Sequence, residues 1–112
     1  MSLDELRGER LILREEGSGT RAIFEDALRR QNCTLADFEQ VSTISDFALM
    51  KSLTAEGLGV SFLYGPVVHE ELKAGTLEKF ELAEMPMSGS FYFACLKDNL
   101  FSGLWEEWVR EE

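Results

Sequence analysis

Three short runs that contain apolar residues, each followed by a segment with helical periodicity, most constrain how this chain can fold. The runs occupy residues 11–13, 41–44 and 60–64, and turn residues bound each of them. Segments of this length between turn signals predict β-strands, and the first, Leu11-Ile12-Leu13, is expected to be buried. Because strands and helices alternate, the pattern predicts an α/β fold, with a mostly parallel sheet, right-handed crossovers and helices flanking the sheet.

The first two helices have clear start signals. Residues 18–31 place their apolar side chains on one face and their charged pairs on the other, and Ser18 or Thr20 can cap this helix. Ser45 is the expected N-cap of the second helix, with Asp46 in its first turn. Both starts follow a predicted strand directly, as the alternating pattern requires.

The second half of the chain continues this pattern and then departs from it. Trp105 and Trp108 have the spacing of a helix face that packs in a core or an interface. The expected elements are a helix over residues 66–75, strands over 77–82 and 90–97, and a final helix over 101–110.

Composition restricts the possible partners. The chain has 112 residues, the length of one domain, and a net charge of −10, which disfavours direct contact with nucleic acid. Cys33, Cys95 and the single histidine, His69, lack metal-ligand spacing, so we expect no metal and no cofactor. The sequence has no secretion signal and no apolar run of roughly 18 residues, which predicts a cytoplasmic protein without membrane contact.

Three strand-to-helix turns, at residues 16–21, 43–46 and 64–66, fall at the carboxyl edge of the predicted sheet, where α/β proteins bind ligands. In the first turn, glycines, backbone N–H groups and hydroxyls meet at a helix N-terminus, which favours a small anion. Arg21 could form a bidentate pair with a ligand carboxylate. Plain helix capping accounts for the same residues and stays open as the alternative.

Two enzymatic interpretations of the first turn are weaker. Residues 17–22 fit the dinucleotide pattern G-x-G-x-x-A, but the chain is too short for the second βαβ half of such a fold. Ser18 lacks the flanking glycines of a nucleophile elbow. We therefore expect no catalytic residue and no enzymatic activity.

A family resemblance sharpens this picture. The segments AEGLGVSFL at 55–63, VV at 67–68 and ELKAGTL at 71–77 resemble the effector domain of LysR-type transcriptional regulators. Residues 14–21 and 91–94 are similar to the opening and the returning strand of that domain's second subdomain. The resemblance covers about residues 6–109.

The resemblance implies a fold like type II periplasmic binding proteins, with two α/β subdomains and a small molecule between them. The chain would be a shortened piece of this effector domain, and residues 1–3 would be foreign residues derived from a vector. It would hold the second subdomain over about residues 6–90, then the returning strand and C-terminal helix over about 90–112. DNA binding would belong to an N-terminal winged helix-turn-helix outside the chain.

The resemblance also places an effector site at the three turns. Tyr64 stands where many relatives have Pro or Ser, and no Arg lies near Gly89, where many in the similar branch carry one. The ring of Tyr64 is thus expected to fill or reshape the pocket. With Arg21 added from the turn chemistry, the expected effector-binding residues are Ser18, Gly19, Thr20, Arg21, Thr43, Ser45 and Tyr64.

The expected function is therefore effector sensing in a LysR-type regulator, with a carboxylate or oxyanion as the ligand. The alternatives are a substrate-binding component of a transporter and, less favoured, a fragment of a dinucleotide-binding enzyme. Because the Trp105 and Trp108 face would lack its partner subdomain, self-association as a dimer or by helix exchange is also expected.

Overall fold

A computed structural model describes residues 2–82, 84–86 and 91–96 of the chain. It contains one sheet with the strand order β2-β1-β3-β5-β4. The strands are β1 (Arg10–Leu13), β2 (Gln40–Thr43), β3 (Val60–Tyr64), β4 (Leu77–Phe80) and β5 (Phe91–Leu96).

The first three strands are parallel to one another, as the alternating pattern predicts. β1 pairs with β2 on one side and with β3 on the other. β5 lies antiparallel between β3 and β4, so the sheet is mixed rather than uniformly parallel. This arrangement leaves β2 and β4 as the two edge strands.

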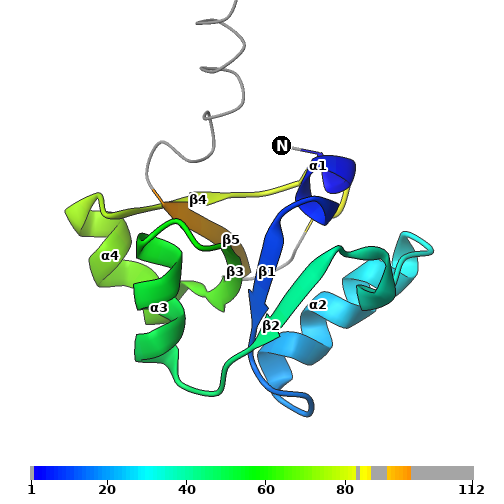
Figure 1. Cartoon of the computed structure of the whole chain (residues 1–112), viewed down its shortest axis with the longest axis horizontal. Helices are drawn as coiled ribbons and strands as arrows, with labels where there is room; N and C mark the ends of the chain where they lie inside the picture. The colour runs from blue at the N-terminus through cyan, green and yellow to red at the C-terminus, as the bar shows by residue number, and fades with distance from the viewer. Residues whose placement is uncertain (1, 83, 87–90, 97–112) are drawn as a thin grey trace, which may run out of the picture.

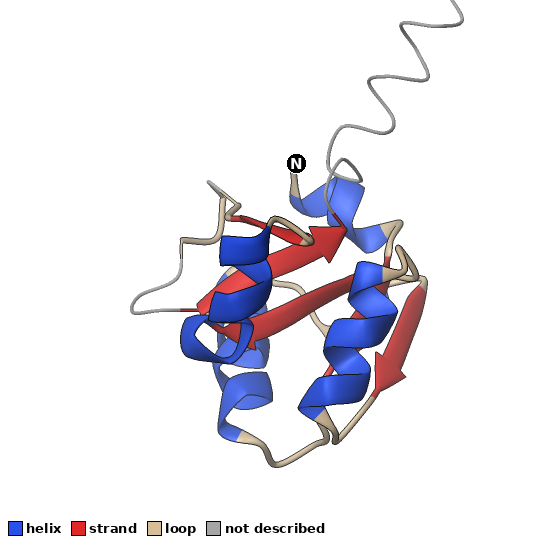
Figure 2. Cartoon of the chain, turned by 90° about the vertical axis from the view of Figure 1, so that its left-hand side faces the viewer, coloured by secondary structure: helices blue, strands red, loops and turns tan. Residues whose placement is uncertain are grey.

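Helices cover both faces of the sheet (Figures 1 and 2). Two of them, α1 (Leu3–Arg7) and α2 (Gly19–Arg30), lie on one face, and α3 (Phe47–Ala55) and α4 (His69–Ala74) lie on the other. Short 3₁₀ turns, η1 (Leu35–Asp37) and η2 (Gly65–Val68), precede β2 and α4. Among the described residues, no helix is long and apolar enough to cross a membrane.

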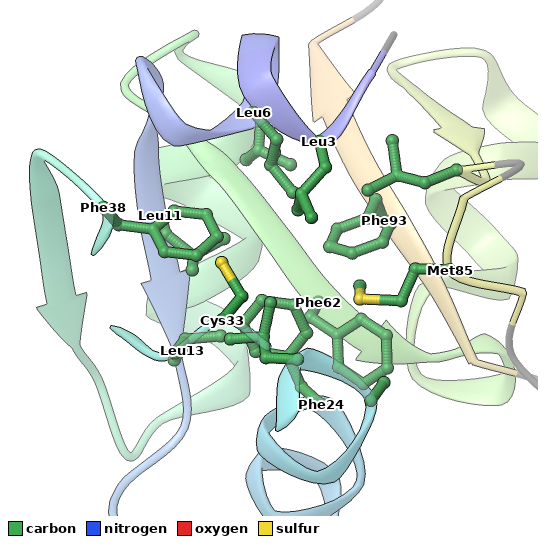
Figure 3. Close-up of a cluster of buried hydrophobic side chains, with 14 of the residues drawn as sticks. Leu3, Leu6, Leu11, Leu13, Phe24, Cys33, Phe38, Phe62, Met85 and Phe93 are labelled. Atoms are coloured by element: carbon green, nitrogen blue, oxygen red, sulfur yellow. The ribbon is translucent and has the colours of Figure 1, made fainter. Parts of the chain in front are cut away.

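The larger core lies between the sheet and the α1/α2 layer (Figure 3). Phe24 of α2 is fully buried and meets the rings of Phe62 and Phe93 at centroid distances of 5.2 and 5.7 Å. Leu3 and Leu6 of α1 close this core from above in Figure 3. Burial of these rings fixes α2, and with it the turn that precedes α2, against the strands.

The smaller core lies under α3 and α4 and includes Met50, Leu63 and Val68. A buried polar contact fixes α3 to the sheet here. The Thr54 hydroxyl donates to the Met50 carbonyl at 2.6 Å and lies 2.6 Å from the Ser61 hydroxyl of β3. Because both side chains are fully buried, each hydroxyl needs its partner.

Most expected elements are found, with local differences. The predicted cap at Ser45 is wrong, because Asp46 caps α3 by accepting from Ala48 N at 2.9 Å. A carboxylate at this position also interacts favourably with the helix dipole. The fourth strand ends at Phe80 rather than at residue 82. Its ladder with β5 also ends at Phe80. The third helix opens with the tighter turn η2.

The N-terminal helix α1 was not expected. Its signal was present as Ser2-Leu3-Asp4-Glu5, a capping-box pattern that the structure forms with both reciprocal hydrogen bonds. Leu3 is only 5% exposed. Leu3, expected to be foreign, therefore contributes to the core. The final helix expected over 101–110 lies outside the described residues.

Candidate functional site at the carboxyl edge of the sheet

The turns after β1 and β2 lie together at the carboxyl edge of the sheet, at the bottom of Figure 1. Successive crossovers change direction and face at β1, because β2 lies on one side of it and β3 on the other. Such a switch point is where open α/β sheets form a ligand crevice. The β1–β3 ladder covers only Leu11–Val60 and Ile12–Ser61, while β3 continues to Tyr64.

The turn between β1 and α2 has an accessible backbone. Gly17 has φ +93°, which L side chains rarely adopt, and Ser18 caps α2 by accepting from Arg21 N at 3.1 Å. The first i→i−4 bond of α2 runs from Ala22 N to Ser18 O, so the N–H groups of Gly19 and Thr20 precede the helical ladder. A Cβ added at Gly19 would meet no atom within 4 Å, so the space above it is open.

Arg21 joins the first two turns. Its guanidinium donates to the Arg14 carbonyl at 3.1 Å, to the Thr43 hydroxyl at 3.3 Å and to Glu25 at 3.3 Å. The side chain is only 13% exposed. Arg21 therefore fixes the ends of β1 and β2 to the first turn of α2, and three of the expected residues, Ser18, Arg21 and Thr43, meet through these contacts.

Arg14 is a site residue that the sequence reasoning missed. Its guanidinium carbon lies 4.1 Å from the centroid of the Phe47 ring, and its Nη2 pairs with Glu15 at 2.7 Å. Its Nε is buried and has no hydrogen-bond partner among the described residues. The signal was an arginine directly after a buried strand, at the predicted ligand edge.

The remaining expected residues take different positions. Ser45 is exposed beside the Asp46 cap, and Thr20 is partly buried in the first turn of α2. Tyr64 ends β3 with 43% of its surface exposed, and its ring lies 5.2 Å from that of Phe91. Tyr64 thus packs against β5 at the end of β3.

A second polar cluster lies away from this edge and links α1 to η1. Arg7 donates to the Cys33 sulfur at 3.1 Å, and this hydrogen bond raises the pKa of Arg7. The pKa of Asp37 is lowered, first by the hydrogen bond from Thr34 N–H at 2.8 Å and then by one from Cys33. Within the described part of the chain, no group of His, Cys, Asp and Glu could hold a metal ion.

Comparison with known proteins supports the family resemblance. The family described as LysR substrate binding domain matches residues 1–111. The chain is 35% identical over 79 residues to the uncharacterized HTH-type transcriptional regulator YeiE of Escherichia coli K12. These residues make up 70% of the chain and 26% of that protein. It is 31% identical over 100 residues to the HTH-type transcriptional regulator CfxR of Cupriavidus necator, covering 89% of the chain and 31% of the relative.

A third relative is also an HTH-type transcriptional regulator. The HTH-type transcriptional regulator CbbR of Sinorhizobium medicae is 27% identical over 93 residues, which is 82% of the chain and 29% of that protein. The chain thus spans less than a third of the length of these relatives. The resemblance seen in the residues is confirmed, and the chain belongs to the family of LysR substrate-binding domains.

Proposed function

We propose that this chain is the effector-sensing part of a LysR-family transcriptional regulator, and that it binds a small carboxylate or oxyanion at the carboxyl edge of its sheet. Family membership supports the regulatory role, as do the relatives, which are HTH-type transcriptional regulators. The single observation that carries the site lies just after β1, where Arg21 donates to the Arg14 carbonyl and the buried Nε of Arg14 has no hydrogen-bond partner among the described residues.

The two arginines have different roles in this proposal. Arg21 is held by three acceptors, so it organises the edge and contributes its positive charge. Arg14 keeps an unpartnered Nε, and its pair with Glu15 is weak because that carboxylate is 39% exposed. A ligand anion can therefore displace Glu15 and pair with the planar guanidinium of Arg14 at a small cost in free energy.

The first turn of α2 supplies the remaining donors. The N–H groups of Gly19 and Thr20 point out of the helix start, where the helix dipole also favours negative charge. The hydroxyls of Thr20 and Ser45 add donors at the rim, and Tyr64 forms an aromatic wall. This donor set fits an anion better than a cation.

The chain would act within a larger protein. We propose that it corresponds to the second α/β subdomain, that β5 is its returning strand, and that a first subdomain and a DNA-binding domain lie outside the chain. The ligand would then shift the protein between two arrangements, which it can do only through unequal affinity for them.

Calorimetric titration of malonate and inorganic phosphate tests the site, in the 112-residue chain and in the full-length gene product. Thr20→Val should weaken binding in the full-length protein by about 1 kcal/mol, the scale of one lost hydrogen bond. Arg14→Gln should weaken binding further, since a hydrogen bond to a charged group contributes more. Thr34→Val, at an exposed threonine beyond the opposite end of α2, serves as the matched control.

Unchanged affinity in both site variants would contradict the proposed anion site. The regulatory role has its own test in the coding sequence upstream of the codon for Leu3. A winged helix-turn-helix there would support it, and a secretion signal would favour a transporter component instead.

A further inference from the structure

A groove of about 460 Å³ lies on the α4 face of the sheet and takes no part in the site proposed above. It opens between η2, α4 and the strands β4 and β5. Its volume falls within the range of small-molecule sites. Its lining residues are Gly65, Pro66, His69, Leu72, Lys79 and Tyr92.

The charge of this groove contrasts with that of the chain. The protein has 21 acidic against 11 basic residues, yet none of the six residues lining the groove is acidic. The Lys79 ammonium lies 4.2 Å from the centroid of the Tyr92 ring. Nearby on α4, Glu71 is paired with Lys51 at 3.2 Å, so its charge is already countered. The groove therefore presents a cation without a carboxylate of its own.

The groove and the first turn of α2 are on opposite faces of the sheet. Tyr92 and Ala94 share one face of β5 because side chains alternate along a strand, and Ala94 belongs to the α3/α4 core. Phe91, which contacts Tyr64, packs against the core on the α2 face. A ligand in the groove would therefore not contact the first turn of α2.

We infer that this groove binds a small organic carboxylate with a flat apolar body. The Tyr92 ring, Pro66 and Leu72 form apolar walls against which such a body can stack. Lys79 forms no hydrogen bond or ion pair with the described residues, so its N–H donors can bind an anion while the Tyr92 ring stabilises its charge. His69, which is exposed at the rim, adds an imidazole N–H.

The apolar walls and the single ammonium define the ligand class. An inorganic anion would use Lys79 but leave the walls uncovered, and a neutral aromatic molecule would cover the walls but leave the ammonium unpaired. A molecule with one carboxylate on a flat ring satisfies both. Phenylacetate is a suitable probe, and phenylacetamide is its neutral counterpart of the same shape.

Two-dimensional ¹H–¹⁵N NMR of the 112-residue chain tests this inference. Phenylacetate should produce saturable shifts at the amides of His69, Lys79 and Tyr92, while phenylacetamide should bind at least about threefold more weakly. Lys79→Gln should weaken phenylacetate binding by about threefold to fivefold, the effect expected for one exposed ion pair. Lys73→Gln, at an exposed lysine in the last turn of α4, should leave it unchanged.

The two sites can be separated in the same experiment. Arg14→Gln should remove any phenylacetate shifts near the first turn of α2 and leave those in the groove intact. The inference is wrong if the groove amides do not shift. It is also wrong if both probes bind equally, or if the Lys79 and Lys73 variants behave alike. None of these outcomes bears on the carboxyl-edge site, which has its own variants.

Discussion

Replacing Arg21 by methionine should destabilise the protein by about 2–3 kcal/mol. Methionine keeps the apolar stem but removes all three hydrogen bonds. The bond to the Arg14 carbonyl, at 3.1 Å, has a charged donor and contributes roughly 1.5–3 kcal/mol. The pair with Glu25, a carboxylate that is 32% exposed, adds at most about 1 kcal/mol, and the 3.3 Å bond to Thr43 adds less.

Urea unfolding followed by far-UV circular dichroism measures this change as a shift in the transition midpoint. Arg30→Met is the matched control, because Arg30 lies on the same helix, pairs with Asp26 and is 72% exposed. We expect the control to change stability by less than about 0.5 kcal/mol. Equal effects of the two substitutions would refute the role of Arg21 in organising the carboxyl edge, since both remove one guanidinium from α2.

Three further predictions follow from contacts within the fold. Thr54→Val should cost about 1–3 kcal/mol because it leaves the Ser61 hydroxyl buried without its partner, and the double variant with Ser61→Ala should cost less than the sum of the two single changes. Additive effects in the same urea assay would contradict this coupling. Asp37→Asn should reduce the loss of stability on acidification. The lowered pKa of Asp37 stabilises the fold above about pH 4, and this contribution is lost as the pH falls through the folded-state pKa. Parallel acid unfolding curves for the Asp37→Asn variant and the unsubstituted protein would disprove this role of Asp37. Gly59→Ala should destabilise the protein by more than about 1 kcal/mol, because the added Cβ would lie 2.7 Å from the Arg10 carbonyl oxygen, and an unchanged melting temperature would exclude this steric conflict.

The local elements follow closely from the sequence. Short segments bounded by turn residues predict β1, β2 and β3 to within one residue at each end. Burial of apolar side chains accounts for β1 and β3, whereas β2 is an edge strand whose residues are mostly exposed. Gly57 and Gly75 both have φ +80°, as expected for glycines that end helices. The Ser18 cap is also found, since an oxygen on a short side chain at this position reaches the N–H of Arg21.

Three features did not follow from local patterns in the sequence, and one of them, the Ser45 cap, was predicted wrongly. Strand pairing in space places β5 antiparallel between β3 and β4, which no local periodicity encodes. The cap of α3 is Asp46 rather than Ser45, because the choice between adjacent polar residues depends on where the helix enters the core. The Lys79–Tyr92 groove exists only because β4 and β5 are neighbours.

The sequence by itself determined the family, the alternation of strands and helices, and the presence of three polar turns at one edge. The tertiary structure decided how those turns are used. Arg21, a candidate ligand contact in the sequence, donates to the backbone of Arg14 and to Thr43. Arg14, which was not among the expected ligand contacts, has a buried Nε without a hydrogen-bond partner among the described residues at the same edge. The reason is physical: a sequence specifies which groups can donate hydrogen bonds, but only packing decides which acceptors come within reach.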